Sequence, residues 1–371
     1  MHIHKTTRCS LKHLASLISS VLIGAVISTA TYAQTTLIKP PSPPSREWLS
    51  IPKIHGRLTA QDMGLVINTA DPYSVEVGEY YARRRGIPDA QVLRLELPVK
   101  AQLNEAEFGA LSGQIREFMG SQVQALALAW TQPYAVECNS ITSAITTGYA
   151  PQFCNKGCLP NRASPLFNSP SAKPFTEHGM RPSMLLASRS VASAKALIER
   201  GIASDQQLGK IGVPMATALF VSTTDAARNV RAKLYPPPKE VPSKGLKVVV
   251  HEGNDDGGTP RVFLYETGLT HVPNLDRVEW LPGALADHLT SFGGRLLDNS
   301  GQMSALDWLE SGATASYGTV SEPCNFVQKF PHPQILLLNY IQGATAIESY
   351  WRSVAWPTQG VFIGEPLAAP F

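Results

Sequence analysis

Alternating apolar runs and amphipathic segments over residues 63–130 most constrain the fold of this chain. The apolar run 63–68 is suited to a buried strand, and Asp71-Pro72 supplies a helix N-cap followed by proline at the first helical position. Glycine and proline then stop the helix, and QVLRLEL (91–97) alternates like a second strand. The sequence therefore predicts a βαβ unit at the start of the body.

The same alternation repeats further along the chain. Asn104 with Glu107 forms a capping-box pattern that opens a second helix, and VQALALAW (123–130) is a third strand. Further strands are predicted in MLLAS, TALFVS, LKVVV and RVFLYE, with helices after the first two. We therefore expect one α/β domain over 57–371, with a mostly parallel sheet and helices on both faces.

Residues 134–181 form a loop-rich insertion that contains five prolines between residues 151 and 174. Irregular segments of this length are usually functional or disordered, and a disulfide within the segment would favour order. We expect this insertion to flank or cover the carboxyl edge of the sheet, where open α/β sheets place their ligands.

The N-terminal residues are typical of a cleavable secretory signal. Lys5, Arg8 and Lys12 precede an apolar run that ends in Thr31-Tyr32-Ala33. A retained anchor is less well supported, because the run is short for a span and no positive cluster follows it. We expect a signal peptide over 1–33, a proline-rich linker over 34–56, and a soluble periplasmic or secreted product without a membrane span after cleavage.

The charge balance narrows the range of partners. The chain has 32 basic and 29 acidic residues, and loss of the three cations of the signal leaves 29 of each. A neutral chain without a basic run argues against nucleic acid as the partner. The composition leaves an envelope protein, a peptide, a glycan or a small molecule open as the partner, and no cofactor is expected.

Signal cleavage leaves an even number of cysteines, which favours disulfides in an oxidising compartment. They are Cys138, Cys154, Cys158 and Cys324. A zinc site is less well supported, because only two of the four are close in sequence and three residues separate them. If the strands before Cys138 and Cys324 are parallel, their loops share one edge of the sheet, which predicts the pairs Cys138–Cys324 and Cys154–Cys158.

Several segments carry a resemblance to a known family. They are NTADPYSVEVGEYYARRRGIP, LPGALADHLTSFGG, GATASYGTVSEPCNF, and KFPHP with the terminal GEPLAAPF. Together they resemble an exported bacterial protein family of uncharacterised function, over nearly the whole mature chain. The resemblance implies export and supplies no activity.

The order of these segments is also similar to the layout of gingipain-like cysteine peptidases of the caspase-like group. That resemblance implies a caspase-like scaffold, on which a His follows one strand and a nucleophilic Cys follows the next. Here Glu266-Thr267-Gly268 stands where His-Gly is expected, and VEWLPGALADH offers no Cys. On this alignment the cysteine dyad is absent, and a disulfide explains Cys324 better than catalysis does.

PGALADHLTSFGG places an acid, an imidazole and hydroxyls close together. A hydrolase could use Ser291 as nucleophile, His288 as base and Asp287 as the orienting acid. We expect a helix that starts at Pro282 and ends in a left-handed turn at Gly293-Gly294, and neighbours on a helix point about 100° apart. A structural role is favoured over catalysis, because closeness in sequence rarely gives catalytic geometry.

Two further segments carry polar side chains. A strand through 316–320 would deliver Glu322 to the carboxyl edge, where loop residues commonly face substrate; a turn beside a structural cysteine is an equal alternative. HEGNDDGG (251–258) offers oxygen ligands but lacks the spaced acids of an EF-hand. A hairpin turn between two strands explains it better, and no metal is expected.

The sequence thus favours an exported protein with a binding or assembly role in the envelope, on a caspase-like scaffold without the cysteine dyad. The alternative is a hydrolase that uses His288 with Ser291, or Glu322, at the carboxyl edge of the sheet. Hydrogen-bond reach between His288 and Ser291 beside an open pocket would favour the hydrolase.

Overall fold

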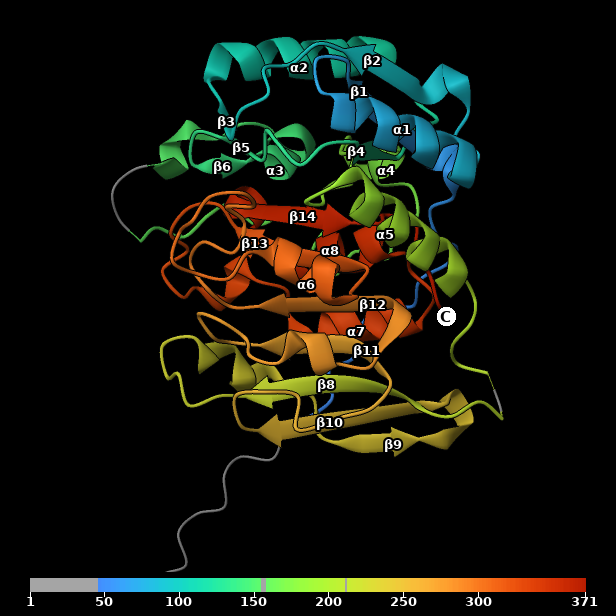
Figure 1. Ribbon diagram of the computed structural model, residues 1–371, viewed down its shortest axis with the longest axis vertical. Helices are drawn as coiled ribbons and strands as arrows, with labels where there is room; N and C mark the ends of the chain where they lie inside the picture. The colour runs from blue at the N-terminus through green and yellow to red at the C-terminus, as the bar shows by residue number, and fades with distance from the viewer. Residues whose placement is uncertain (1–45, 155–157, 211) are drawn as a thin grey trace, which may run out of the picture. The chain divides into compact units, whose positions relative to one another are not determined.

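The computed structural model describes residues 46–154, 158–210 and 212–371, and the predicted signal peptide lies outside them. An eleven-stranded sheet runs through the body (Figure 1). Its strands, in spatial order, are β2 (Val92–Leu95), β1 (Met63–Asn68), β4 (Ala125–Leu128), β7 (Ser183–Leu185), β14 (Gly360–Gly364), β13 (Ala315–Thr319), β12 (Trp280–His288), β11 (Val262–Thr267), β8 (Ala216–Ser222), β10 (Leu246–Glu252) and β9 (Lys239–Val241). A small second sheet contains β3 (Gln102–Leu103), β5 (Ala135–Val136) and β6 (Asn139–Ser140).

The helices of the described chain occupy the connections between these strands. They are α1 (Pro72–Arg85), α2 (Glu105–Phe118), α3 (Ile141–Thr147), α4 (Pro174–His178), α5 (Val191–Ser204), α6 (Ala305–Ser311), α7 (Pro333–Ile341) and α8 (Ala346–Ser353). Short 3-10 segments include η4 (Asn229–Leu234), η7 (Val327–Lys329) and η8 (Pro357–Gln359).

The first βαβ unit forms as the sequence predicts. The Asp71 side chain accepts a hydrogen bond from the backbone N–H of Tyr73, and Pro72 begins α1. Gly86 ends the helix with a left-handed φ of 67°, which glycine adopts without steric cost. Asn104 and Glu107 close a capping box at the start of α2, so both predicted helix starts are confirmed.

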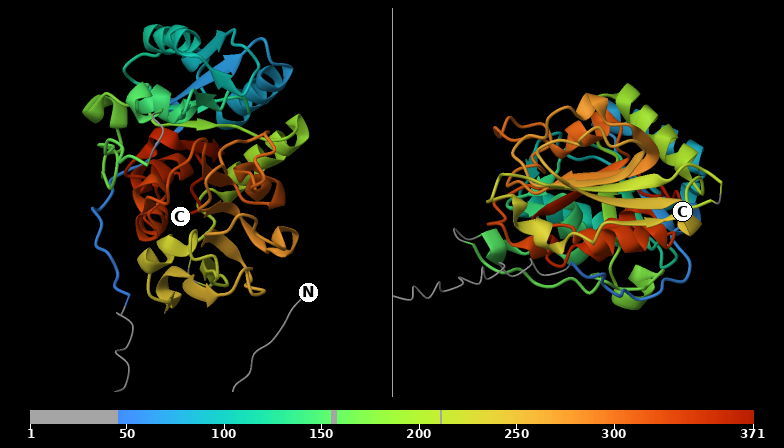
Figure 2. Two further views of the ribbon diagram at one scale, coloured as in Figure 1. Left: turned by 90° about the vertical axis from the view of Figure 1, so that its left-hand side faces the viewer. Right: turned by 90° about the horizontal axis from the view of Figure 1, so that it is seen from below.

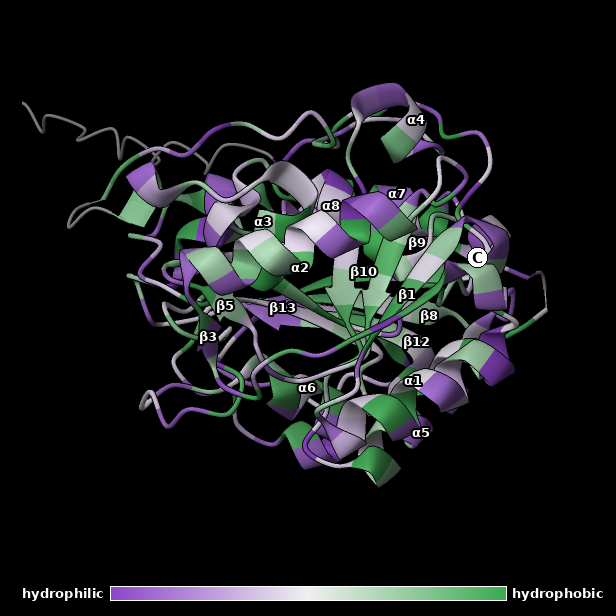
Figure 3. Ribbon diagram, turned by 90° about the horizontal axis from the view of Figure 1, so that it is seen from above, coloured by the Kyte–Doolittle hydropathy of each residue, from purple (hydrophilic) through white to green (hydrophobic). Residues whose placement is uncertain are grey.

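Helices cover both faces of the sheet (Figures 2 and 3). In β1, Leu65 and Ile67 belong to a core cluster with Val77 of α1, whereas Val66 belongs to a second cluster with Leu111 of α2. Every residue of β1 is buried. Burial on both faces is typical of strands in a parallel sheet, and it explains why these strands are almost continuously apolar.

Apart from the edge strand β9, which pairs antiparallel with β10, the sheet consists of two parallel halves that run in opposite directions. β14 pairs parallel with β7 and antiparallel with β13. Thr319, at the end of β13, therefore lies opposite Gly360, at the start of β14. As a result, the carboxyl edge of the half from β13 to β10 is the amino edge of the half from β2 to β14.

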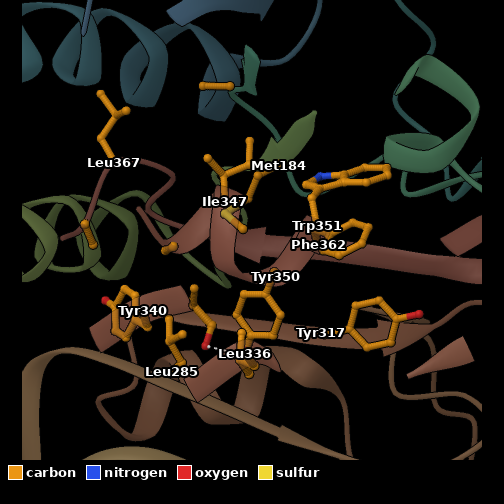
Figure 4. Close-up of a cluster of buried hydrophobic side chains, with 14 of the residues drawn as sticks. Met184, Leu285, Tyr317, Leu336, Tyr340, Ile347, Tyr350, Trp351, Phe362 and Leu367 are labelled. Carbon is orange, nitrogen blue, oxygen red and sulfur yellow. Dashed lines mark hydrogen bonds between the residues drawn. The ribbon is translucent and has the colours of Figure 1, made fainter. Parts of the chain in front are cut away.

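Aromatic side chains fill the core where the two halves meet (Figure 4). Trp351 of α8 stacks on Phe362 of β14 with ring centroids 4.3 Å apart, and Tyr317 of β13 meets the same ring edge-on at 5.1 Å. The indole N–H of Trp351 donates to the carbonyl of Ser183 at 3.0 Å. Large aromatic rings with satisfied polar atoms stabilise this junction and fix α8 against it.

Two local predictions are wrong. Residues 280–288 form strand β12 instead of a helix, because a short buried apolar run such as Ala284–Ala286 has no periodicity that separates the two. Gly294 does not end a helix but permits close packing: a Cβ there would lie 2.6 Å from the carbonyl oxygen of Gly318. HEGNDDGG is not a hairpin either, since β8 lies between β10 and β11.

The cysteines form two disulfides, but the predicted pairing is wrong. Cys138 pairs with Cys154 and Cys158 pairs with Cys324. The prediction assumed that β4 and β13 are parallel, whereas they belong to halves of opposite direction. Cys138 still lies near the end of β13, because the chain turns back after β4, and its carbonyl accepts a 2.7 Å hydrogen bond from the Ser321 hydroxyl.

The insertion 134–181 contains more regular structure than the sequence indicates. Within it, α3 is largely buried, and the Ser140 and Thr142 hydroxyls both donate to the carbonyl of Gly360. The insertion is thereby attached to the start of β14. In the described part of the predicted linker, Leu49 N–H donates to the Gln334 side chain at 2.8 Å.

Candidate functional site

The candidate residues from the sequence lie at or beside the carboxyl edge of the β13–β10 half. β11 ends at Thr267, β12 at His288 and β13 at Thr319, so their following loops emerge together. Open α/β sheets place ligands at such an edge.

Asp287 and His288 point to opposite faces, because consecutive residues of a strand alternate. Asp287 pairs with Arg231 of η4, with 2.6 Å between the carboxylate oxygen Oδ1 and the guanidinium nitrogen Nη1. His288 Nδ1 accepts a 2.9 Å hydrogen bond from the indole N–H of Trp308 on the other face. In this structure Asp287 therefore does not orient the imidazole.

His288 is held as a neutral imidazole. Burial, followed by the positive charge of Arg231, lowers its pKa to about 3. Because Nδ1 accepts from Trp308, the proton of the neutral ring lies on Nε2, and Nε2 has no hydrogen-bond partner among the described residues. A general base needs a free lone pair, which this tautomer does not present to the edge.

The structure shows no hydrogen bond between the side chains of His288 and Ser291 in the chain it describes. Ser291 is half-buried, and its backbone carbonyl accepts from the Thr319 hydroxyl at 2.9 Å. This contact ties the loop after β12 to the end of β13. The pairing of His288 and Ser291 as a catalytic dyad stays a hypothesis.

A fully buried charged cluster lies directly beneath this edge. Glu266 and Asp287 are register partners on β11 and β12, so their carboxyl groups lie side by side on one face. Arg231 serves both, since its Nη1 is 2.6 Å from Asp287 and 3.6 Å from Glu266. Its Nη2 also donates to the Thr267 carbonyl at 3.0 Å, which fixes η4 on the strand ends.

One cation cannot balance two buried carboxylates. Burial raises the pKa of Glu266 well above its usual value, and neither of its side-chain oxygens has a hydrogen-bond partner among the described residues. Asp287 is the closer partner of Arg231. Burial raises the pKa of Asp287 as well, but its close contact with Arg231 opposes that effect more strongly than the 3.6 Å contact does for Glu266.

The two disulfides frame a pocket of about 280 Å³, which we call the cystine pocket. All four bridged cysteines line it, together with Ser321, Glu322, Lys329, Gln359, Phe153 and Leu159. The Gln359 amide donates to the Glu322 carbonyl at 2.7 Å and holds the loop after β13. Of the predicted catalytic residues, Glu322 alone lines this pocket.

Lys329 is the pocket residue that sequence reasoning missed. Its side chain is nearly buried, at 2% exposure, and its ammonium nitrogen makes no hydrogen bond or ion pair with a described residue. Burial lowers its pKa to about 8, against the opposing charge of Glu322. A lysine in the turn VQKF has no sequence signature, so only the fold identifies it.

No group of three or more His, Cys, Asp or Glu side chains among the described residues is placed to hold a metal ion. Among the same residues, no helix is both long enough and apolar enough to cross a membrane.

The geometry defines an α/β protein with a mostly parallel central sheet. Three solved structures are similar to the chain at low sequence identity. An Arg-specific cysteine proteinase, gingipain R, matches with a TM-score of 0.40 and 12% identity, over 84% of this chain and 78% of that one. The complex of pro- and mature domains of RgpB from Porphyromonas gingivalis matches at 0.39 and 12%, over 85% and 79%.

A third structure, described as a protease, matches with a TM-score of 0.41 and 9% identity, over 85% of this chain and 79% of that one. No protein-family profile matches the chain, and no curated protein does.

Proposed function

We propose that this chain is an exported envelope protein that binds a peptide or glycan at the cystine pocket, on an α/β scaffold without thiol chemistry. One observation carries the proposal: every cysteine of the described chain is in a disulfide. A cysteine peptidase needs a free thiolate, and a bridged sulfur cannot supply one. The bridges are compatible with an oxidising compartment, as the signal-like N-terminus predicts.

The features of the pocket support binding. Its walls combine apolar side chains with a single lysine amine. Both of its loops are cross-linked, so they would lose little conformational freedom when a ligand binds. Leu159 is 47% exposed beside this pocket. An apolar side chain left open there offers contact area to a partner.

A hydrolase is the second candidate, and the lowered pKa of Lys329 beside Glu322 is the observation that favours it. A lysine that is partly neutral near pH 8 can accept a proton, and a carboxylate can return one. His288 with Ser291 is the other catalytic pair proposed from the sequence.

The test is a thermal-shift screen of envelope peptides and oligosaccharides against the purified mature protein, followed by analysis of each stabilising compound for cleavage. Binding without cleavage, lost in Lys329→Met and kept in the exposed control Lys233→Met, supports the proposal. Cleavage that depends on His288 or Glu322 supports the hydrolase. Compounds that stabilise wild type and Lys329→Met equally contradict binding at this pocket.

A further inference from the structure

A separate cavity of about 480 Å³ lies between α2, α3 and the segment that leads into β7. We call it the arginine pocket, because Arg116 and Arg181 line it. None of the predicted site residues and none of the cystines contributes to its wall.

Arg181 is fixed in place before any ligand arrives. Its Nε donates to the Val123 carbonyl at 2.9 Å, and its Nη2 donates to the carbonyls of Met119 and Gly120 at 3.0 and 3.1 Å. The guanidinium carbon lies 3.4 Å from the ring centroid of Phe175, which fixes the plane of the group. Nη1 is the nitrogen that makes no hydrogen bond with a described residue.

The charge of this pocket is not balanced. Its wall contains two arginines and no Asp or Glu, and neither arginine forms an ion pair among the described residues. Arg181 is only 8% exposed, and burial lowers its pKa with no carboxylate to oppose the effect. Arg231 differs, because two carboxyl groups lie within 4 Å of it. Backbone carbonyls compensate Nε and Nη2 in part, and an anion at Nη1 would supply the missing counter-charge.

The remaining wall indicates the rest of the ligand. Ile115, Ile145 and Phe175 provide apolar surface, while the Ser112 hydroxyl lies on the same helix as Arg116. The volume is within the range of small-molecule sites. A planar guanidinium matches two oxygens of a phosphate or carboxylate better than it matches a point charge.

We propose that the arginine pocket binds a small molecule that carries an oxyanion, a phosphate or carboxylate group, attached to a compact apolar body. Arg181 and Arg116 contact the oxyanion, and the aliphatic and aromatic wall contacts the body. This site is separate from the cystine pocket, and the two proposals stand independently.

The test is isothermal titration of the full mature protein with phenyl phosphate and with inorganic phosphate at low salt. Phenyl phosphate should bind more tightly than phosphate, because only it reaches the apolar wall. Arg116→Ala should weaken binding about tenfold or more, as expected for loss of a hydrogen bond from a charged group. Arg83→Ala removes an exposed helical arginine outside the pocket and should change nothing.

Ser112→Asp provides a second variant that keeps the fold, because Ser112 is only half-buried on α2. The new carboxylate lies one helical turn from Arg116 and can pair with it in place of the ligand, so binding of phenyl phosphate should be lost. Arg181 itself is left unchanged, since it also holds the backbone after α2. Equal binding by wild type, Arg116→Ala and Ser112→Asp would overturn the proposal, as would no binding of phenyl phosphate by wild type up to about 10 mM.

Discussion

Replacement of Arg231 by Met is the most informative perturbation of the fold. Arg231, Glu266 and Asp287 are essentially unexposed, and the arginine is the cation that the structure places between the two carboxyl groups. Methionine fills much of the same volume but leaves Asp287 buried without a counter-charge. Removing one partner of such a pair costs about 3–5 kcal/mol of unfolding free energy.

The pH dependence of that loss follows from the same geometry. Without Arg231 the carboxyl groups remain buried, so their folded-state pKa values rise further above the unfolded values. A raised carboxyl pKa contributes stability at low pH that is lost as the pH increases through it. The deficit of Arg231→Met should therefore be smaller at pH 4.5 than at pH 7.5.

Urea unfolding followed by tryptophan fluorescence measures both effects. The triple variant Arg231→Met/Glu266→Gln/Asp287→Asn removes all three ionisable groups, so no buried charge is left unpaired, and it should recover most of the lost stability. Arg94→Met, which breaks the exposed Arg94–Glu79 pair, should show no measurable change. An unfolding free energy of Arg231→Met within about 1 kcal/mol of wild type would show that Arg231 does not stabilise the buried carboxyl groups.

Three further predictions concern the disulfides, a close backbone contact and a buried histidine. Loss of Cys158–Cys324, with a sequence separation of 166, should lower the unfolding free energy by about 5 kcal/mol in the entropy model. Loss of Cys138–Cys154, with a separation of 16, should lower it by about 3 kcal/mol. Equal losses measured by urea unfolding would contradict this difference. Gly318→Ala places a carbon 2.4 Å from the Gly293 carbonyl carbon, so calorimetry should show a large drop in melting temperature, and unchanged melting would disprove close packing. Because the folded pKa of His288 is about 3 and its usual value 6.5, the unfolded chain binds the extra proton, and stability should fall from pH 6.5 toward pH 3. His288→Gln should lose less stability over that interval than wild type, and an equal loss would show that the histidine does not titrate on unfolding.

The sequence predicts strands and helices well where their signals are local. Asp71-Pro72 and the Asn104–Glu107 capping box define helix starts by short-range chemistry, and the apolar runs define buried strands. Strand direction is different: nothing within TASYGTV or GVFIG states that the two strands are antiparallel. The disulfide pairing failed for that reason, because it depended on a direction set by tertiary packing.

The candidate sites also differ in how much of them the local sequence predicts. Glu322 follows a predicted strand and could be placed near an edge from the sequence alone. Lys329 and Arg181 acquire their properties from burial among residues distant in the chain, which no local pattern encodes. Side chains alternate between the two faces of strand β12, so Asp287 and His288 lie on opposite faces of the sheet. The sequence predicted a helix here, and a helix does not place neighbouring residues in this way.

The proposed function requires a mature chain without a thiol nucleophile, with each of its cysteines in a bridge. Intact-mass analysis of protein directed to the periplasm, after denaturing alkylation without reductant, measures the free thiols. We expect a mature chain that begins at Gln34 and carries no alkyl group, and four alkyl groups once the bridges are reduced. An alkyl group on Cys324, or on any other cysteine of the unreduced mature chain, would contradict it.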